Sequence, residues 1–131
     1  MTGFVDANVL VRHVTGDPPA MAVRATRYLE SARDLLLPDL IVAEIAYVLE
    51  SFYRAPRSQV AVILRSILAF PAILVVDRAL LQRTIEVYEV DRLDFADAYL
   101  VASAERTGVG VIVSFDRSID RVRTVRREEP G

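Results

Sequence analysis

Four acidic residues stand in stretches that are otherwise largely apolar. Asp6 and Asp116 directly follow short apolar runs, whereas Glu44 and Asp97 lie inside longer ones. A charge in such a setting must be paired, exposed or bound to a cation, because burying an isolated charge is costly. Crowded carboxylates repel one another unless a cation lies among them. Since the chain has no cysteine and one histidine, an all-oxygen site here suits Mg²⁺ or Mn²⁺ rather than zinc.

Each of these acids also has a purely structural interpretation. Asp6 could cap the helix that follows it, and Asp116 could start a turn. Asp97 could complete a capping box with Asp94, the expected N-cap of its helix. Glu44 could lie on a narrow exposed strip, although we favour a paired or metal-bound Glu44 because its helix is apolar on nearly all sides.

Metal held by carboxylates would suit the hydrolysis of phosphodiesters. A divalent ion can activate water and stabilise charge on a phosphoryl group, and a carboxylate can orient the water or take its proton. An anionic site repels a substrate that carries phosphate groups, so binding such a substrate would need cations nearby. The candidates by position are Arg12, Arg92, Arg117, Arg121 and Arg123, although for each arginine taken alone we favour the interpretation of an ordinary solvated side chain.

Short continuous apolar runs alternate with helical patterns along the chain. This alternation predicts an α/β protein whose parallel sheet is covered on both faces, in one domain over residues 1–131. The expected strands are 2–6, 35–38, 73–76 and 109–113, with a possible last strand at 122–125. The expected helices include 20–33, 40–53, 58–70, 78–90 and one from Asp94 to Gly108. Asp6 and Asp116 would then stand at the carboxyl ends of strands, where such sheets bind ligands.

Composition excludes several classes of protein. All 16 basic residues are arginine, so the chain cannot use a catalytic lysine, a Walker-type P-loop or the lysine of a receiver domain. No stretch approaches the roughly 20 apolar residues of a membrane span. The N-terminus has no basic region typical of a secretory signal, and the absence of cysteine fits a cytoplasmic protein.

The ordered motifs resemble the PIN domain, specifically VapC-type toxins, over essentially the whole chain. They are Phe4-Val5-Asp6-Ala7-Asn8-Val9-Leu10, a Glu44 that we expect to be buried, Asp94-Phe95-Ala96-Asp97-Ala98 and Ser114-Phe115-Asp116-Arg117. The resemblance implies a three-layer α/β/α fold with a short central parallel sheet of four or five strands. It also implies a Mg²⁺- or Mn²⁺-dependent endoribonuclease, the toxin of a toxin–antitoxin pair.

Carried over residue by residue, the resemblance assigns roles to particular side chains. The catalytic acids are Asp6, Glu44, Asp97 and Asp116, of which Asp6, Asp97 and Asp116 would bind metal. The supporting residues are Asn8, Asp94 and Ser114. By their position in the chain, and not from the resemblance, we propose that Arg12, Arg92 and Arg117 contact RNA.

The resemblance further implies a homodimer and a VapB-type antitoxin, whose C-terminal segment would place an arginine among the carboxylates. The predicted helix through Val60–Leu68 is apolar over more than one face, so it is either centrally buried or part of an interface with helix 40–53. We favour the interface.

Two other functions remain open. A catalytically inactive PIN-like module that binds RNA or protein would be expected to have a broken acidic set, and this set is intact. A phosphatase of the haloacid-dehalogenase type needs a second aspartate where Asn8 stands, and also a lysine.

Overall fold

The computed structural model describes residues 2–131 and divides the chain into two compact units, Met1–Val76 and Asp77–Gly131. Every pair of neighbouring strands is parallel, with helices between successive strands of the first unit, so the predicted α/β class is confirmed. The five strands form one sheet of three and one of two, rather than the single sheet of four or five that we expected. A single domain over residues 1–131 stays a prediction.

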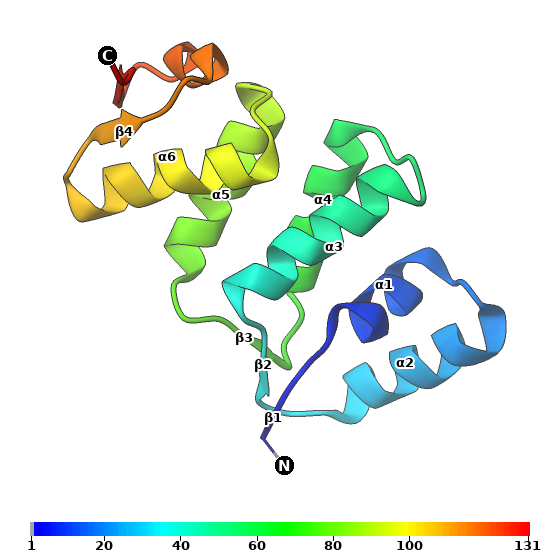
Figure 1. Cartoon of the computed structure of the whole chain (residues 1–131). Helices are drawn as coiled ribbons and strands as arrows, with labels where there is room; N and C mark the ends of the chain where they lie inside the picture. The colour runs from blue at the N-terminus through cyan, green and yellow to red at the C-terminus, as the bar shows by residue number, and fades with distance from the viewer. Residues whose placement is uncertain (1) are drawn as a thin grey trace. The chain divides into compact units, whose positions relative to one another are not determined.

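The first unit is built on a three-stranded sheet with the order β1-β2-β3 (Figure 1). Its elements are β1 (Gly3–Phe4), α1 (Ala7–Thr15), α2 (Pro19–Ser31), β2 (Leu35–Leu36), α3 (Asp39–Ser51), α4 (Arg57–Leu68) and β3 (Ile73–Leu74). The strands are very short, but one further bond from Val5 N to Leu36 O, at 3.0 Å, extends the pairing to the residue before Asp6. The sheet therefore fixes the backbone directly at this acid.

Helices α3 and α4 bury a shared apolar surface in the first unit. On α3 the buried positions Val42, Ile45 and Leu49 recur at helical spacing. The stripe of α4 is also buried, and it consists of Val60, Ala61, Leu64, Ile67 and Leu68. Because α3 and α4 pack on each other within one chain, this stripe is centrally buried, whereas an interface through the remaining apolar side chains of α4, such as the exposed Val62, stays a prediction.

The second unit pairs two long helices with a short two-stranded sheet. Its elements are α5 (Arg78–Val90), α6 (Phe95–Thr107), β4 (Val111–Val113), the 3₁₀ helix η1 (Arg117–Arg121) and β5 (Arg126–Glu128). As predicted, α6 ends at Gly108, which adopts the left-handed conformation with φ 77°. An ion pair from Arg83 to Glu105, with Nε and Oε1 2.8 Å apart, joins α5 to α6.

The last strand is displaced from its predicted position. We expected it at residues 122–125 because valines stand at both ends of that run, but β5 spans Arg126–Glu128. Val122 is instead buried where η1 ends. The strand itself is a charged edge strand, which apolar patterning does not reveal. Among residues 2–131, no helix has the length and apolar character needed to cross a membrane.

Candidate active site

Asp6 and Asn8 form the start of a site at the carboxyl end of β1. Asp6 is the N-cap of α1, and its Oδ1 accepts a hydrogen bond from Ala7 N at 2.8 Å. Asn8 Nδ2 donates to Asp6 Oδ2 at 3.2 Å. The capping interpretation of Asp6 is thus confirmed. It does not exclude a second role, because the Asp6 side chain is exposed and lines a pocket.

Glu44 lies on the exposed face of α3 and lines the same pocket as Asp6, Asn8 and Arg12. Our expectation of a buried Glu44 was wrong, because Glu44 is exposed, whereas the pairing or metal binding that we favoured for it stays a prediction. The sequence misled because α3 also exposes two large apolar side chains, Leu40 at 79% and Tyr47 at 68%, which made the helix look apolar all round.

The pocket has a volume of about 340 Å³ and lies entirely within the first unit. It extends from the acids to Phe52 and Tyr53 at the end of α3. Tyr53 Oη donates to Asp17 Oδ2 at 2.9 Å, which fixes the tyrosine side chain at that end. The sequence had not suggested functional roles for these residues, since no local motif relates them to the acids.

Asp97 and Asp116 interact directly in the second unit. Asp97 is half-buried in the first turn of α6, and Asp116 follows β4. Burial, the hydrogen bond with Asp116 and the negative charges of Asp116 and Asp94 raise the pKa of Asp97 to about 6. Asp94 occupies the N-cap position without a side-chain capping bond, so the capping box considered for Asp97 is not formed. The two interacting carboxyls titrate as a pair, and a bound cation would offset the repulsion between their negative charges.

The Asp116 carboxylate is held by its own turn. Its Oδ1 accepts from Ser118 N at 2.9 Å, and Asp116 N donates to Ser114 Oγ at the same distance. Asp116 is therefore the N-cap of η1, as its turn-start interpretation predicted. The hydrogen bonds from Ser118, followed by the one with Asp97, lower the pKa of Asp116. Ser114 thus contacts Asp116 through the backbone.

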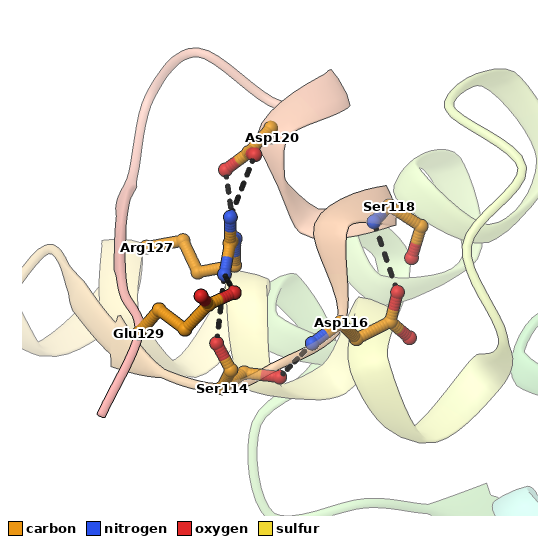
Figure 2. Close-up of polar contacts among 6 residues, drawn as sticks. All are labelled: Ser114, Asp116, Ser118, Asp120, Arg127 and Glu129. Carbon is orange, nitrogen blue, oxygen red and sulfur yellow. Dashed lines mark hydrogen bonds and ion pairs between the residues drawn. The ribbon is translucent and has the colours of Figure 1, made fainter. Parts of the chain in front are cut away.

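Arg127 ties this turn to β5 (Figure 2). Its Nε and Nη2 donate to the two carboxylate oxygens of Asp120, at 3.1 and 3.2 Å. Its Nη1 donates to the carbonyl oxygen of Ser114 and to Glu129 Oε1, both at 2.9 Å. The Arg127 side chain is only 12% exposed. No sequence pattern predicts this contact, because Asp120 and Arg127 belong to different elements.

A comparison with known protein families gives one match, the PIN domain, which covers residues 3–125. This chain belongs to the PIN domain family. The family resemblance and the predicted fold class are thereby confirmed, and PIN domains are in general metal-dependent nucleases. No curated protein matches the chain. The match ends before β5, so Arg127 lies outside the matched residues.

The donor set of this PIN domain fits a hard divalent cation. Asp6 and Glu44 present carboxylate oxygens to one pocket, while Asp97 and Asp116 present an interacting pair. Oxygen ligands of this kind suit Mg²⁺ and Mn²⁺. Within residues 2–131, no three acidic or histidine side chains form a group able to hold a metal. The meeting of all four acids at one site therefore stays a prediction.

The three arginines proposed to contact RNA have different surroundings. Arg12 is half-buried and lines the pocket beside Asp6. Arg117 is exposed and is the first residue of η1, directly after Asp116. Arg92 is exposed, with a left-handed φ of 61°, and its carbonyl oxygen accepts a hydrogen bond from Arg121 Nη1 at 3.0 Å. Their contacts with RNA stay predictions.

Proposed function

We propose that this PIN domain is a Mg²⁺- or Mn²⁺-dependent endoribonuclease and that Asp6, Glu44, Asp97 and Asp116 are its catalytic acids. The observation that carries the proposal is the Asp97–Asp116 pair. Burial and the neighbouring Asp116 raise the pKa of the half-buried Asp97, whereas the pKa of Asp116 is lowered, and perturbed carboxyls of this kind are typical of functional sites. Membership of a family of metal-dependent nucleases supports the same chemistry.

Each acid has a role that its surroundings support. Asp97 and Asp116 would hold the metal together with Asp6, whose exposed carboxylate is oriented by Ala7 N and Asn8 Nδ2. Glu44, exposed in the same pocket as Asp6, is available to orient the attacking water or to accept its proton. A bound Mg²⁺ or Mn²⁺ would supply Lewis-acid stabilisation of charge on the phosphoryl group. Arg12, Arg92 and Arg117 would attract the RNA backbone.

We further propose the biological setting implied by the VapC-type motifs, a cytoplasmic toxin with a VapB-type antitoxin and a homodimeric state. The exposed apolar side chains of α3, Leu40 and Tyr47, support the dimer because they leave apolar surface uncovered. Sedimentation of the purified chain would test the dimer, and Tyr47→Glu should shift it to the monomer. A wild-type chain that sediments as a monomer at micromolar concentration would contradict the proposed dimer. It would not contradict the proposed nuclease activity.

The nuclease proposal is tested by cleavage of short single-stranded RNAs and total tRNA. The purified protein is compared with Asp6→Asn and Asp97→Asn in Mn²⁺, in Mg²⁺ and in EDTA. We expect cutting by the wild type only with metal, and loss of cutting in both variants. Wild type and variants that behave alike, together with no divalent-ion binding by calorimetry, would make the acids structural and favour an inactive interaction module. Turnover of a phosphomonoester in place of RNA would favour the phosphatase.

A further inference from the structure

The pocket of the first unit continues past the acids to an aromatic pair. Phe52 is 73% exposed although it is a large apolar residue. Its ring meets the Tyr53 ring edge to face, with centroids 4.9 Å apart and planes at 72°. Both residues line the pocket that also contains Asp6, Asn8 and Glu44. A flat apolar surface is thus available next to the candidate catalytic acids.

Asp17 and Tyr53 make this end of the pocket polar as well as aromatic. Asp17 Oδ2 accepts from Tyr53 Oη at 2.9 Å, which fixes the ring and orients the carboxylate. Among the described residues, Tyr53 is the one side chain that donates a hydrogen bond to this carboxylate, so Asp17 Oδ1 can accept another donor. Asp17 is exposed at the pocket and can therefore receive that donor from a ligand.

These features match the chemistry of an unpaired RNA base better than that of a phosphate. A base has a flat face that stacks on an aromatic ring, and single-stranded RNA is recognised largely by such stacking. The amino groups of adenine, cytosine and guanine donate to carboxylates, whereas uracil has no amino group. Arg12, the one basic residue among the described side chains of the pocket, can contact the backbone that carries the base.

We propose that the Phe52 end of the pocket binds an unpaired base beside the cleaved bond, stacked on Phe52 and with its amino group donating to Asp17. The inference rests on the proposed ribonuclease function and adds a base preference to it. Phe52 and Asp17 are then specificity-determining residues, and Tyr53 is a positioning residue that orients Asp17.

The role of Phe52 is tested by separating ring stacking from apolarity. Phe52→Leu keeps an apolar side chain and loses the flat ring, whereas Phe52→Trp keeps a ring. Phe4→Leu is the matched control, because Phe4 is an exposed phenylalanine outside this pocket and undergoes the same change of side chain. The readouts are binding of a fluorescent, unstructured RNA in EDTA by anisotropy and kcat/KM for its cleavage in Mn²⁺. We expect a loss of roughly tenfold in both for Phe52→Leu, restored in Phe52→Trp.

The role of Asp17 is tested by the identity of the base. Cleavage is measured for a set of RNAs in which one position at a time, near the cut, carries each of the four bases. We expect one position at which uracil is cut roughly tenfold more slowly than an amino-bearing base, and Asp17→Asn should abolish that difference. Kinetics of Phe52→Leu indistinguishable from wild type on every RNA would overturn the subsite and leave the nuclease standing.

Two other outcomes also decide the matter. If the wild-type chain neither binds nor cuts any RNA, the subsite falls together with the proposed function. If Phe52→Leu leaves RNA binding and cutting intact but abolishes binding of a protein partner, the pocket is a protein-docking site and the base-binding proposal is wrong.

Discussion

The two units of this chain hold their candidate catalytic acids in different ways. Asp6 and Glu44 are exposed in an open pocket, and Asp6 is oriented by one backbone and one side-chain hydrogen bond. Asp97, which is half-buried in α6, interacts directly with Asp116. The turn that carries Asp116 is held by hydrogen bonds of Ser114, Ser118 and Arg127. The Asp6–Glu44 pair is open to a ligand, whereas the charges of the Asp97–Asp116 pair repel one another unless a cation is bound. We therefore expect metal affinity to depend mostly on the second pair and substrate recognition on the first.

The largest effect is expected for Asp97→Asn, which should change activity and stability in opposite directions. Asp97→Asn should reduce metal-dependent cleavage by about 10²–10⁴-fold, the range for loss of a group acting directly in catalysis. At pH 7 without metal, the same change should stabilise the protein, because it removes a half-buried charge next to Asp116. Cleavage assays and denaturant unfolding measure the two effects.

Asp6→Asn is the matched control from the other pair. It should also abolish cleavage, but it should not stabilise the metal-free protein, since Asp6 is exposed and caps α1. If Asp97→Asn lowers the free energy of unfolding as much as Asp6→Asn does, the contrast between the two pairs is wrong.

A smaller effect is expected from removing the brace on the Asp116 turn. Arg127→Ala should lower the free energy of unfolding, because its bonds to Asp120, Glu129 and the Ser114 carbonyl are lost together. Through Ser114 it should also weaken Mn²⁺ binding about 10–100-fold, as loss of an outer-shell contact does.

Arg126→Ala is the control for Arg127, since Arg126 is the exposed preceding residue of the same strand. Calorimetry with Mn²⁺ and chemical denaturation compare the two variants. Equal Mn²⁺ affinity in wild type and Arg127→Ala would show that the brace has no effect on the acids.

The Asp97–Asp116 pair also predicts that the stability of the protein depends on pH. The sign of this dependence should be opposite with and without bound metal. The pKa of Asp97 is about 6 in the folded protein and 3.8 in its ordinary state, so between these values the folded chain binds more protons than the unfolded one. The stability contribution of Asp97 is therefore complete below pH 3.8 and is lost as the pH rises through 6. The lowered pKa of Asp116 acts oppositely at lower pH, where stability is lost as that carboxylate protonates.

Comparison with Asp97→Asn isolates this contribution. Without metal, the wild type should lose stability relative to the variant between pH 4 and pH 6.5. In saturating Mn²⁺ the wild type should instead gain stability as pH rises, because metal binds the deprotonated carboxylates. Thermal unfolding of both proteins across this pH range makes the test, and parallel curves without metal would contradict the raised pKa.

The smallest effect on stability and cleavage is expected from a change at Asn8, beside the exposed Asp6. Asn8→Ala removes an exposed 3.2 Å hydrogen bond to Asp6 and should change stability by less than about 1 kcal/mol. Cleavage should fall only a few-fold, since Asp6 keeps its bond from Ala7 N. Asn8→Asp, which replaces the donor with a second charge, should be more harmful than Asn8→Ala. Steady-state kinetics distinguish the two variants.

Local sequence patterns predicted the elements better than their surroundings. Helix α5 was predicted with its observed bounds, and Gly108 marked the end of α6, because propensity and caps are local properties. The exposure of Glu44 was not predictable in this way, since it depends on which face of α3 packs on α4. Strand β5 was displaced because its pairing with β4 places charged residues at an edge.

The candidate site was predictable only as a set of residue types. Asp6 and Asp116 could be placed because acids that follow parallel strands share the carboxyl ends of those strands. Arg127 could not be found, because its bond to Asp120 depends on how β5 returns past η1. Phe52 and Tyr53 were likewise hidden, since they reach the pocket through the end of α3 and not through a motif.

The place of Arg127 in the chain has a consequence for synthesis. Chains leave the ribosome from the N-terminus onward and begin to fold as they emerge. Arg127 emerges after Ser114, Asp116 and Asp120, so the turn can form its local serine bonds before its arginine brace exists. During translation the nascent chain carries an unbraced acidic turn, and emergence of β5 completes it. For a protein proposed to cut RNA, this order places the bracing of the Asp116 turn after the emergence of β5.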